Sequence, residues 1–176
     1  MDRLGLVYKS WFPQRLTDAR EHFLRAYQLK SAKEEMYIHW AKMEMEASEW
    51  TKAYTAAEYG IKYLPESRKL HYYAGYARSR SGKDFLQQSQ SEKAEKQFIE
   101  AMSHLNNALK PPEKLDNGER SLNADIYRAL IILCESTKDN KLMSQYFDAW
   151  KKEHPDDPNA ISEWDRLSKR YKLYSR

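Results

Sequence analysis

The amino-acid sequence predicts an all-α protein. Valine, which favours strands, occurs only at Val7, and isoleucine and threonine are few. Alanine, leucine, lysine, glutamate, glutamine and methionine, which fit a helix with little loss of side-chain freedom, are plentiful. The five glycines and six prolines fall mostly where helices would end. A strand-based fold is therefore disfavoured.

The overall composition fits a globular protein and argues against several other classes. The 176 residues are 41% hydrophobic and 32% charged, unlike a disordered chain, with a formal net charge of +4. No apolar run approaches the roughly 20 residues of a membrane-spanning helix, and the N-terminus lacks the apolar core of a secretion signal. The single cysteine, Cys134, cannot form an internal disulfide, which favours a reducing, cytoplasmic location.

The hydrophobic pattern predicts helices along nearly the whole chain, with one long connection at 111–118. The last helix is expected to start with Asp157 as its N-cap and Pro158 at its first helical position. Its apolar residues share one face, as a helix that caps a stack requires; they are Ile161, Trp164, Leu167 and Tyr171. The expected helices are 2–12, 16–30, 34–47, 50–63, 68–88, 91–109, 120–136, 140–153 and 158–172.

A pattern of small, large and small residues recurs along the chain. Its first copy is Ala19, Phe23 and Ala26, and the offset from Ala19 to Ala53 is 34 residues. Small residues at this spacing let two antiparallel helices approach closely. The later copies are Ala53, Ala57 and Gly60, and then Ala94, Phe98 and Ala101.

These residues resemble the tetratricopeptide repeat. The second copy carries Trp40 and Ala41, the turn Glu49–Ala53 and Pro65 at the family's positions, and the third has Gly75 and, at the inter-helix turn, Gly82. A fourth, weaker copy has Tyr127, Leu130, Phe147 and Pro155 in register. The resemblance implies one repeat domain over 1–176, a right-handed α-solenoid of about four helical hairpins. Its repeats would be 1–33, 34–67, 68–112 and 119–156, followed by the capping helix 158–172.

The first helix begins almost at Met1 and has no equivalent cap. Either the chain is a fragment of a larger, multidomain protein, or its first helix is naturally short.

The third repeat is longer than the 34-residue repeat of the family. Its small–large–small residues come seven residues late, and Pro111–Pro112 come five to six residues late. Matched delays predict that both helices are about two turns longer, so that the hairpin projects. The alternative is a loop rich in glutamine and serine at 87–91.

No group of residues predicts catalysis. The five histidines include no pair at the i, i+4 spacing that binds a metal on one helix, and Cys134 lies in an apolar run. There is no glycine-rich phosphate-binding loop. We therefore expect neither an enzyme nor a cofactor.

The resemblance implies a concave groove lined by the first helix of each repeat. Lys69, Tyr72, Tyr76 and Arg80 are spaced to share one helix face, with large aromatic area and directed charge. Such a groove suits a protein or peptide with acidic and apolar side chains. The predicted groove residues are Tyr8, His39, Lys42, Lys69, Tyr72, Tyr73, Tyr76, Arg80 and Arg128. Tyr72 and Tyr73 cannot both point fully into the groove, so one is expected to pack between helices.

Two more specific functions are known for repeats of this kind, and the sequence fits them unequally. Binding of a chaperone's C-terminal carboxylate is disfavoured, because only Lys69 matches the five residues that such repeats use. Half-a-tetratricopeptide repeats of RNA-processing proteins share the segment Ala19–Ala26, which leaves RNA binding as the alternative. Residues 1–90 hold 15 basic and 11 acidic side chains, a small surplus for that role. No signal for an oligomeric state was found.

Overall fold

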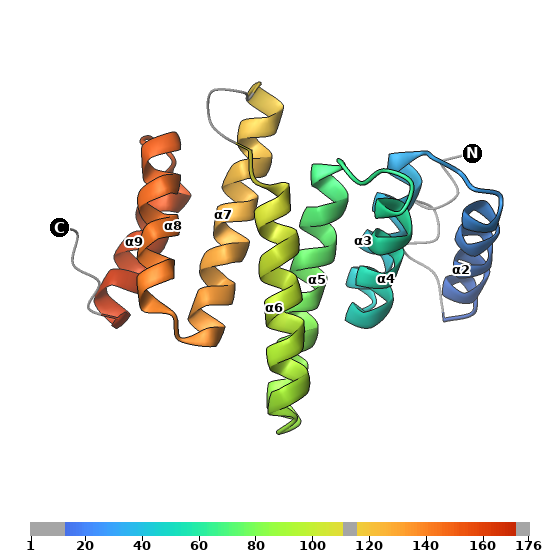
Figure 1. The fold of residues 1–176 in the computed structure, drawn as a ribbon, viewed down its shortest axis with the longest axis horizontal. Helices are drawn as coiled ribbons and strands as arrows, with labels where there is room; N and C mark the ends of the chain where they lie inside the picture. Colours follow the sequence, from blue (N-terminus) through green and yellow to red (C-terminus); the bar gives the residue numbers. More distant parts are fainter. Residues whose placement is uncertain (1–12, 111–115, 172–176) are drawn as a thin grey trace. The chain divides into compact units, whose positions relative to one another are not determined.

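The computed structural model describes residues 13–110 and 116–171, and within these ranges every regular element is an α-helix (Figure 1). The prediction of an all-α protein is confirmed for this part of the chain; the expected helix 2–12 lies outside it. The helices are α2 (Pro13–Gln28), α3 (Glu34–Glu46), α4 (Trp50–Ile61), α5 (Arg68–Gln87), α6 (Ser91–Ala108), α7 (Asn117–Thr137), α8 (Asn140–Glu153) and α9 (Pro158–Tyr171).

Helix α7 begins three residues earlier than the sequence predicted. The Asp116 carboxylate accepts a hydrogen bond from the Glu119 backbone N–H at 2.8 Å, and the Glu119 side chain accepts one from the Asp116 N–H at 3.4 Å. This reciprocal capping box satisfies N–H groups that a helix start leaves free. The prediction that the connection continues to 118 was therefore wrong.

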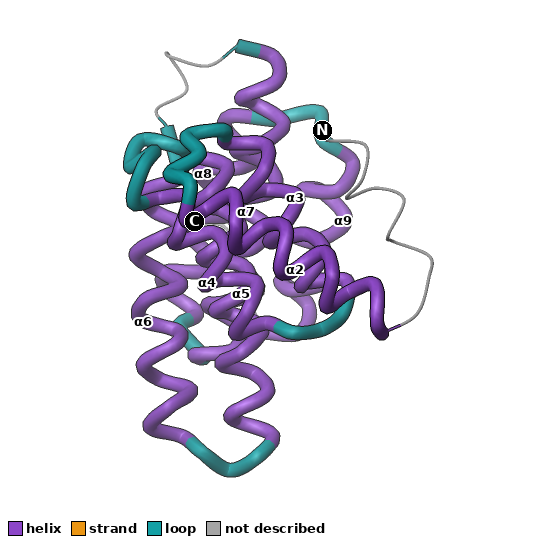
Figure 2. Tube along the Cα trace, turned by 90° about the vertical axis from the view of Figure 1, so that its right-hand side faces the viewer, coloured by secondary structure: helices purple, strands orange, loops and turns teal. Residues whose placement is uncertain are grey.

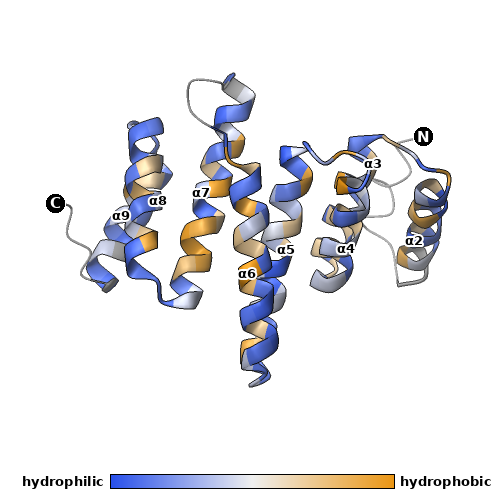
Figure 3. Cartoon of the chain, viewed as in Figure 1, coloured by the Kyte–Doolittle hydropathy of each residue, from blue (hydrophilic) through white to orange (hydrophobic). Residues whose placement is uncertain are grey.

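The contacts divide the chain into two compact units, Met1–Ala108 and Leu109–Arg176. In each unit, helices that follow one another in sequence pack together. Figure 3 shows hydrophobic and hydrophilic residues interleaved along these helices, as expected where one face of each is buried.

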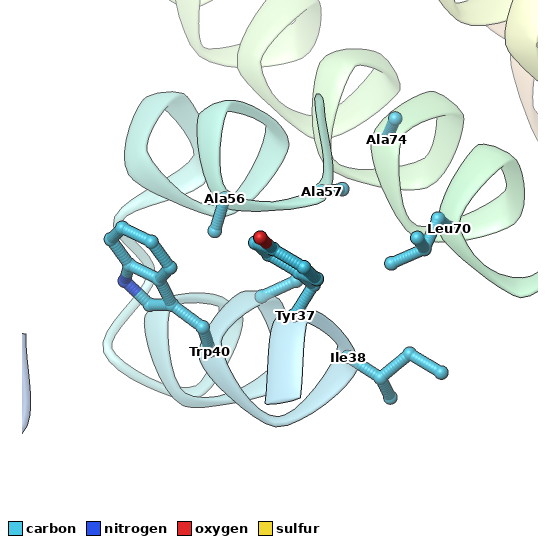
Figure 4. Packing of buried hydrophobic residues seen from close by; sticks show 8 residues of the cluster. Tyr37, Ile38, Trp40, Ala56, Ala57, Leu70 and Ala74 are labelled. Atoms are coloured by element: carbon cyan, nitrogen blue, oxygen red, sulfur yellow. The ribbon is translucent and has the colours of Figure 1, made fainter. Parts of the chain in front are cut away.

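The core of the first unit lies between α3, α4 and α5 (Figure 4). The Tyr37 ring lies among Ala56, Ala57 and Leu70, and all four side chains are fully buried. Gly60 permits this approach, because a Cβ there would lie 2.7 Å from Leu70 and 2.8 Å from Tyr37. The small residues of the predicted pattern are therefore contact points between helices.

Helix α2 is held to this core by ion pairs of Arg20 and by aromatic contacts of Phe23 and Tyr27. Arg20 donates two hydrogen bonds, of 2.8 and 2.6 Å, to the carboxylate of Glu44, whose side chain is 1% exposed. The ring of Phe23 stacks on Trp40 at 5.7 Å between centroids. The ring of Tyr27 stacks on Tyr59 at 4.1 Å.

The hairpin of α5 and α6 is long, as the delayed pattern predicted. The two helices have 20 and 18 residues, and Figures 1 and 2 show their tip extending beyond α3 and α4. Gly82 lies inside α5, where a Cβ would meet the Phe98 ring at 2.5 Å, so its assignment to the inter-helix turn was wrong. The glutamine- and serine-rich segment 87–91 contributes only a short turn at 88–90, so the alternative of a loop in place of the longer helices is wrong.

The second unit is built from α7, α8 and α9. Asp157 accepts a hydrogen bond from the Asn159 N–H at 2.9 Å, which confirms the predicted start of the last helix. Trp164 packs edge-on against Phe147 at 5.1 Å, but Ile161 is 50% exposed. The prediction that Ile161 lies on the buried face was therefore wrong; Ala160, one position earlier, is buried instead.

Candidate functional site

Seven of the nine predicted groove residues lie on α3 and α5. These two helices pack against each other in the first unit. His39 and Lys42 lie on α3, and five more lie on α5: Lys69, Tyr72, Tyr73, Tyr76 and Arg80. Tyr8 lies outside the described residues. Arg128 lies on α7 in the second unit, where it donates to Asp125 at 3.0 Å and lies over the Trp150 ring at 5.6 Å.

Helix α5 starts where it does because Ser67 caps it. The Ser67 hydroxyl oxygen accepts a hydrogen bond from the Leu70 N–H at 3.1 Å and donates to the Glu34 carboxylate on α3. The cap fixes the start of α5 next to α3. From there the steps of three, four and four residues from Lys69 to Arg80 keep four side chains on one face of the helix.

Three tyrosines form the apolar middle of this face. All three are half-buried, and the Tyr72 ring contacts both Tyr73 (5.3 Å, edge-on) and Tyr76 (6.1 Å, tilted). Tyr73 packs against the α3–α4–α5 core, with the Lys42 ammonium 5.4 Å from its ring centroid. This confirms that one tyrosine of the neighbouring pair, Tyr73, packs between helices.

Exposed cations flank the tyrosines at both ends. The Lys69 side chain is 51% exposed, with its ammonium 3.6 Å from Glu35 and 3.9 Å from Glu34. At the other end Arg80 is exposed, and its guanidinium carbon lies 5.0 Å from the centroid of the Trp50 ring. Exposed ion pairs contribute little to stability, so Glu34 and Glu35 hold the Lys69 ammonium only weakly. We call Lys69, Tyr72, Tyr76 and Arg80, with Trp50, the α5 stripe.

Trp50 was not among the predicted site residues. The sequence did place it in the turn motif Glu49–Ala53, and the structure puts it at the first residue of α4. Its position there brings the indole under Arg80. The sequence could have indicated Trp50, because it is an aromatic residue at the predicted start of the helix that precedes the groove helix.

A second polar group, also missed from the sequence, surrounds Arg78 on the α6 side of α5. The Arg78 guanidinium donates to Glu58 of α4 and to Gln97 of α6, each at 3.0 Å, pairs with Glu100 of α6, and lies 4.1 Å from the Tyr54 ring centroid. Its side chain is only 11% exposed. With His71 and His104 these residues form what we call the Arg78 cluster.

The cluster shifts the proton affinities of its members. Burial alone would raise the pKa of Glu58, but hydrogen bonds from His104 and Arg78, and the charges of both, outweigh it and lower that pKa. Burial lowers the pKa of His71, against a hydrogen bond to the Pro65 carbonyl that raises it. In the second unit, burial raises the pKa of Cys134 to about 12, which accords with the expected inert thiol.

Within the described ranges, no three histidine, cysteine, aspartate or glutamate side chains gather in a way that could hold a metal ion. Nor is any helix there long and apolar enough to cross a bilayer. No protein-family model, curated protein or solved structure gives a significant match to this chain.

Proposed function

We propose that this protein is a non-enzymatic, cytoplasmic interaction module that binds a segment of another protein along the α5 stripe. The proposal includes a right-handed solenoid of four tetratricopeptide-like hairpins with α9 as its cap. The observation that carries it is the juxtaposition of two half-buried tyrosines, Tyr72 and Tyr76, with an exposed cation at each end. Large, stiff rings give contact area at low entropic cost, and the cations orient an acidic ligand.

The spacing of the cations describes the ligand. Lys69 and Arg80 are 11 residues apart on one helix, which corresponds to about 16 Å along its axis. An extended peptide covers this length in about five residues. We therefore expect two acidic side chains about five residues apart, with apolar side chains between them over Tyr72 and Tyr76.

RNA binding, the rival function, is less well supported by the same surface. The α5 stripe offers two exposed cations, Lys69 and Arg80, and two tyrosines lie between them. Arg78, the other arginine in this part of α5, adds no available cation, because it is buried among carboxylates. A polyanion needs several unopposed cations in a row.

The test is a selection of peptides from a random library on the purified protein, followed by affinity measurement. We expect the selected peptides to carry acidic residues at the stated spacing. The double variant Tyr76→Ala with Arg80→Ala should bind them at least thirtyfold more weakly, since truncation of such a centre costs about 2 kcal/mol or more. The variant should remain folded, with a modest decrease in melting temperature, because Arg80 is exposed and Tyr76 is only half-buried.

The matched control is Lys96→Ala with Ile99→Ala, two exposed residues on α6. This variant should bind the peptides as the wild type does. If the control loses binding and the stripe variant keeps it, the partner binds the projecting hairpin instead. If the stripe variant unfolds, its side chains are packing groups and the proposed surface is wrong. Tight binding of single-stranded RNA that the stripe variant loses would favour the RNA-processing alternative.

A further inference from the structure

Two histidines of the Arg78 cluster link α5 to α6 through their ring nitrogens. The Nδ1 atoms of His71 and His104 lie 3.0 Å apart. The second nitrogen of His71, Nε2, lies 2.9 Å from the carbonyl oxygen of Pro65, in the connection between α4 and α5. The second nitrogen of His104 lies 3.6 Å from the Glu58 carboxylate on α4. The rings thus form a continuous polar path between a carbonyl and a carboxylate.

The Pro65 carbonyl determines where His71 carries its proton. A carbonyl oxygen can only accept, so Nε2 of His71 must be the donor. A neutral imidazole has a single N–H, which makes Nδ1 of His71 an acceptor. His71 is therefore neutral when it accepts a hydrogen bond from His104.

The same logic gives His104 two protons. Its Nδ1 must donate to the unprotonated Nδ1 of His71, because two bare nitrogens at 3.0 Å would repel. Its Nε2 faces a carboxylate, which also only accepts. With an acceptor at each nitrogen, both contacts of His104 are satisfied only when each nitrogen carries a proton.

The charges around the pair agree with this assignment. The two carboxylates of the cluster, Glu58 from α4 and Glu100 from α6, share one cation, Arg78 from α5. This leaves one negative charge, which a protonated His104 neutralises. The nearby carboxylate of Glu66, in the α4–α5 connection, favours a proton on His71, but burial and the charge of His104 oppose it.

We propose that His71 and His104 together hold one extra proton at neutral pH and act as an acid-sensitive clasp between α5 and α6. A second proton, taken up by Nδ1 of His71, would place two N–H groups and two positive charges face to face. The Nδ1–Nδ1 hydrogen bond is then lost and the junction of α4, α5 and α6 loosens. The clasp is independent of the proposed peptide-binding surface, since it lies on the α6 side of α5.

The direction of the pH dependence follows from the lowered pKa of folded His71, whose ordinary value is 6.5. The unfolded chain binds this proton more readily than the folded chain does. The stability that a neutral His71 contributes is therefore complete above about pH 6.5 and decreases as the pH falls through the folded pKa of His71.

The direct test is long-range ¹⁵N–¹H spectroscopy of the histidine rings in the full chain, assigned with single-histidine variants. At pH 7 we expect both ring nitrogens of His104 to be protonated and only Nε2 of His71. On titration toward pH 5, His71 should take up the second proton. A neutral His104 at pH 7, or protonation of His71 before His104, would overturn the proposal.

A second measurement uses His71→Asn. The asparagine carbonyl oxygen can accept from His104 near the position of Nδ1, but it cannot be protonated. Between pH 6.5 and 5 the wild-type unfolding constant should rise more steeply than that of the variant, by up to tenfold per pH unit. His22→Asn, at an exposed position on α2, should keep the wild-type slope. Equal slopes for wild type and His71→Asn would contradict the clasp, and the ring spectra decide the question if the variant does not fold.

Discussion

Arg78 and Arg80 are two residues apart on α5, yet they are used in opposite ways. Residues at this spacing point about 200° apart around a helix. Each guanidinium lies over an aromatic ring of α4, Tyr54 for Arg78 and Trp50 for Arg80. Arg78 is also buried and paired with Glu58 and Glu100, whereas Arg80 is exposed.

The difference separates directional contacts from adaptable ones. On the Arg78 side, hydrogen bonds of fixed geometry join α4, α5 and α6, and a missing partner would leave a buried charge uncompensated. On the Arg80 side, ring and cation–ring contacts tolerate sliding and tilting. One face of α5 is suited to hold the hairpins together, and the other carries contacts that can be exchanged more easily.

The largest expected effect comes from Arg78→Ala. Removing the guanidinium takes the shared cation from Glu58 and Glu100, leaves Gln97 without its donor and empties the space beside the Tyr54 ring. We expect a loss of about 3 kcal/mol in the free energy of unfolding, measured by urea denaturation. Arg78→Lys, which keeps the charge but not the forked geometry, should lose less. A loss below about 1 kcal/mol for the alanine variant would mean that the cluster is well solvated and the contrast is false.

An intermediate effect is expected from Gly82→Ala on the side of α5 that faces α6. The added Cβ would lie 2.5 Å from the buried Phe98 ring. Overpacking of this kind costs about 1–3 kcal/mol, and the better helix propensity of alanine returns up to about 1 kcal/mol. We expect a net loss of about 1–2 kcal/mol. Combination with Phe98→Leu should cost less than the sum of the two single changes, as coupled neighbours require; strict additivity would contradict the contact.

The smallest effect is expected from Arg80→Ala alone. An exposed cation–ring contact contributes about 0.5–1 kcal/mol, so urea denaturation should show a loss of no more than about 1 kcal/mol. The difference between the losses of unfolding free energy in Arg78→Ala and Arg80→Ala measures how differently the two faces of α5 contribute to stability. Equal losses for the two arginines would show that both faces of α5 are structural.

The helical framework was largely predictable from the sequence because its signals are local. The matched delays of Phe98 and Pro111 gave the long hairpin, and Asp157 with Pro158 gave the start of α9. The start of α7 was misplaced because Asn117 and Gly118 are typical of turns, although the spacing of Asp116 and Glu119 already fitted a capping box.

The polar contacts were not predictable in the same way. A sequence pattern separates apolar from polar positions, but it does not show whether an arginine on a helix meets water or a carboxylate from another helix. Arg78 and Arg80 are alike by that measure. The same limit applies to His71 and His104, whose pairing depends on how α5 and α6 align over 33 residues. For the α5 stripe, the spacing of its four residues on α5 predicted that they share one helix face. That Trp50 lies beside them could be known only from the packing of α4 on α5.

Helix α5 also has a consequence for how the first unit folds. It contacts the helix before it and the helix after it, and the hydrogen bond from Arg68 to the Ala108 carbonyl closes a loop of only 40 residues. Short loops have a low entropic cost of closure, and folds dominated by such local contacts reach the native state quickly. The α4–α5 and α5–α6 hairpins can each form without waiting for a distant segment. A unit of this kind assembles by addition of neighbours onto α5, so little of its apolar surface stays exposed for long during folding.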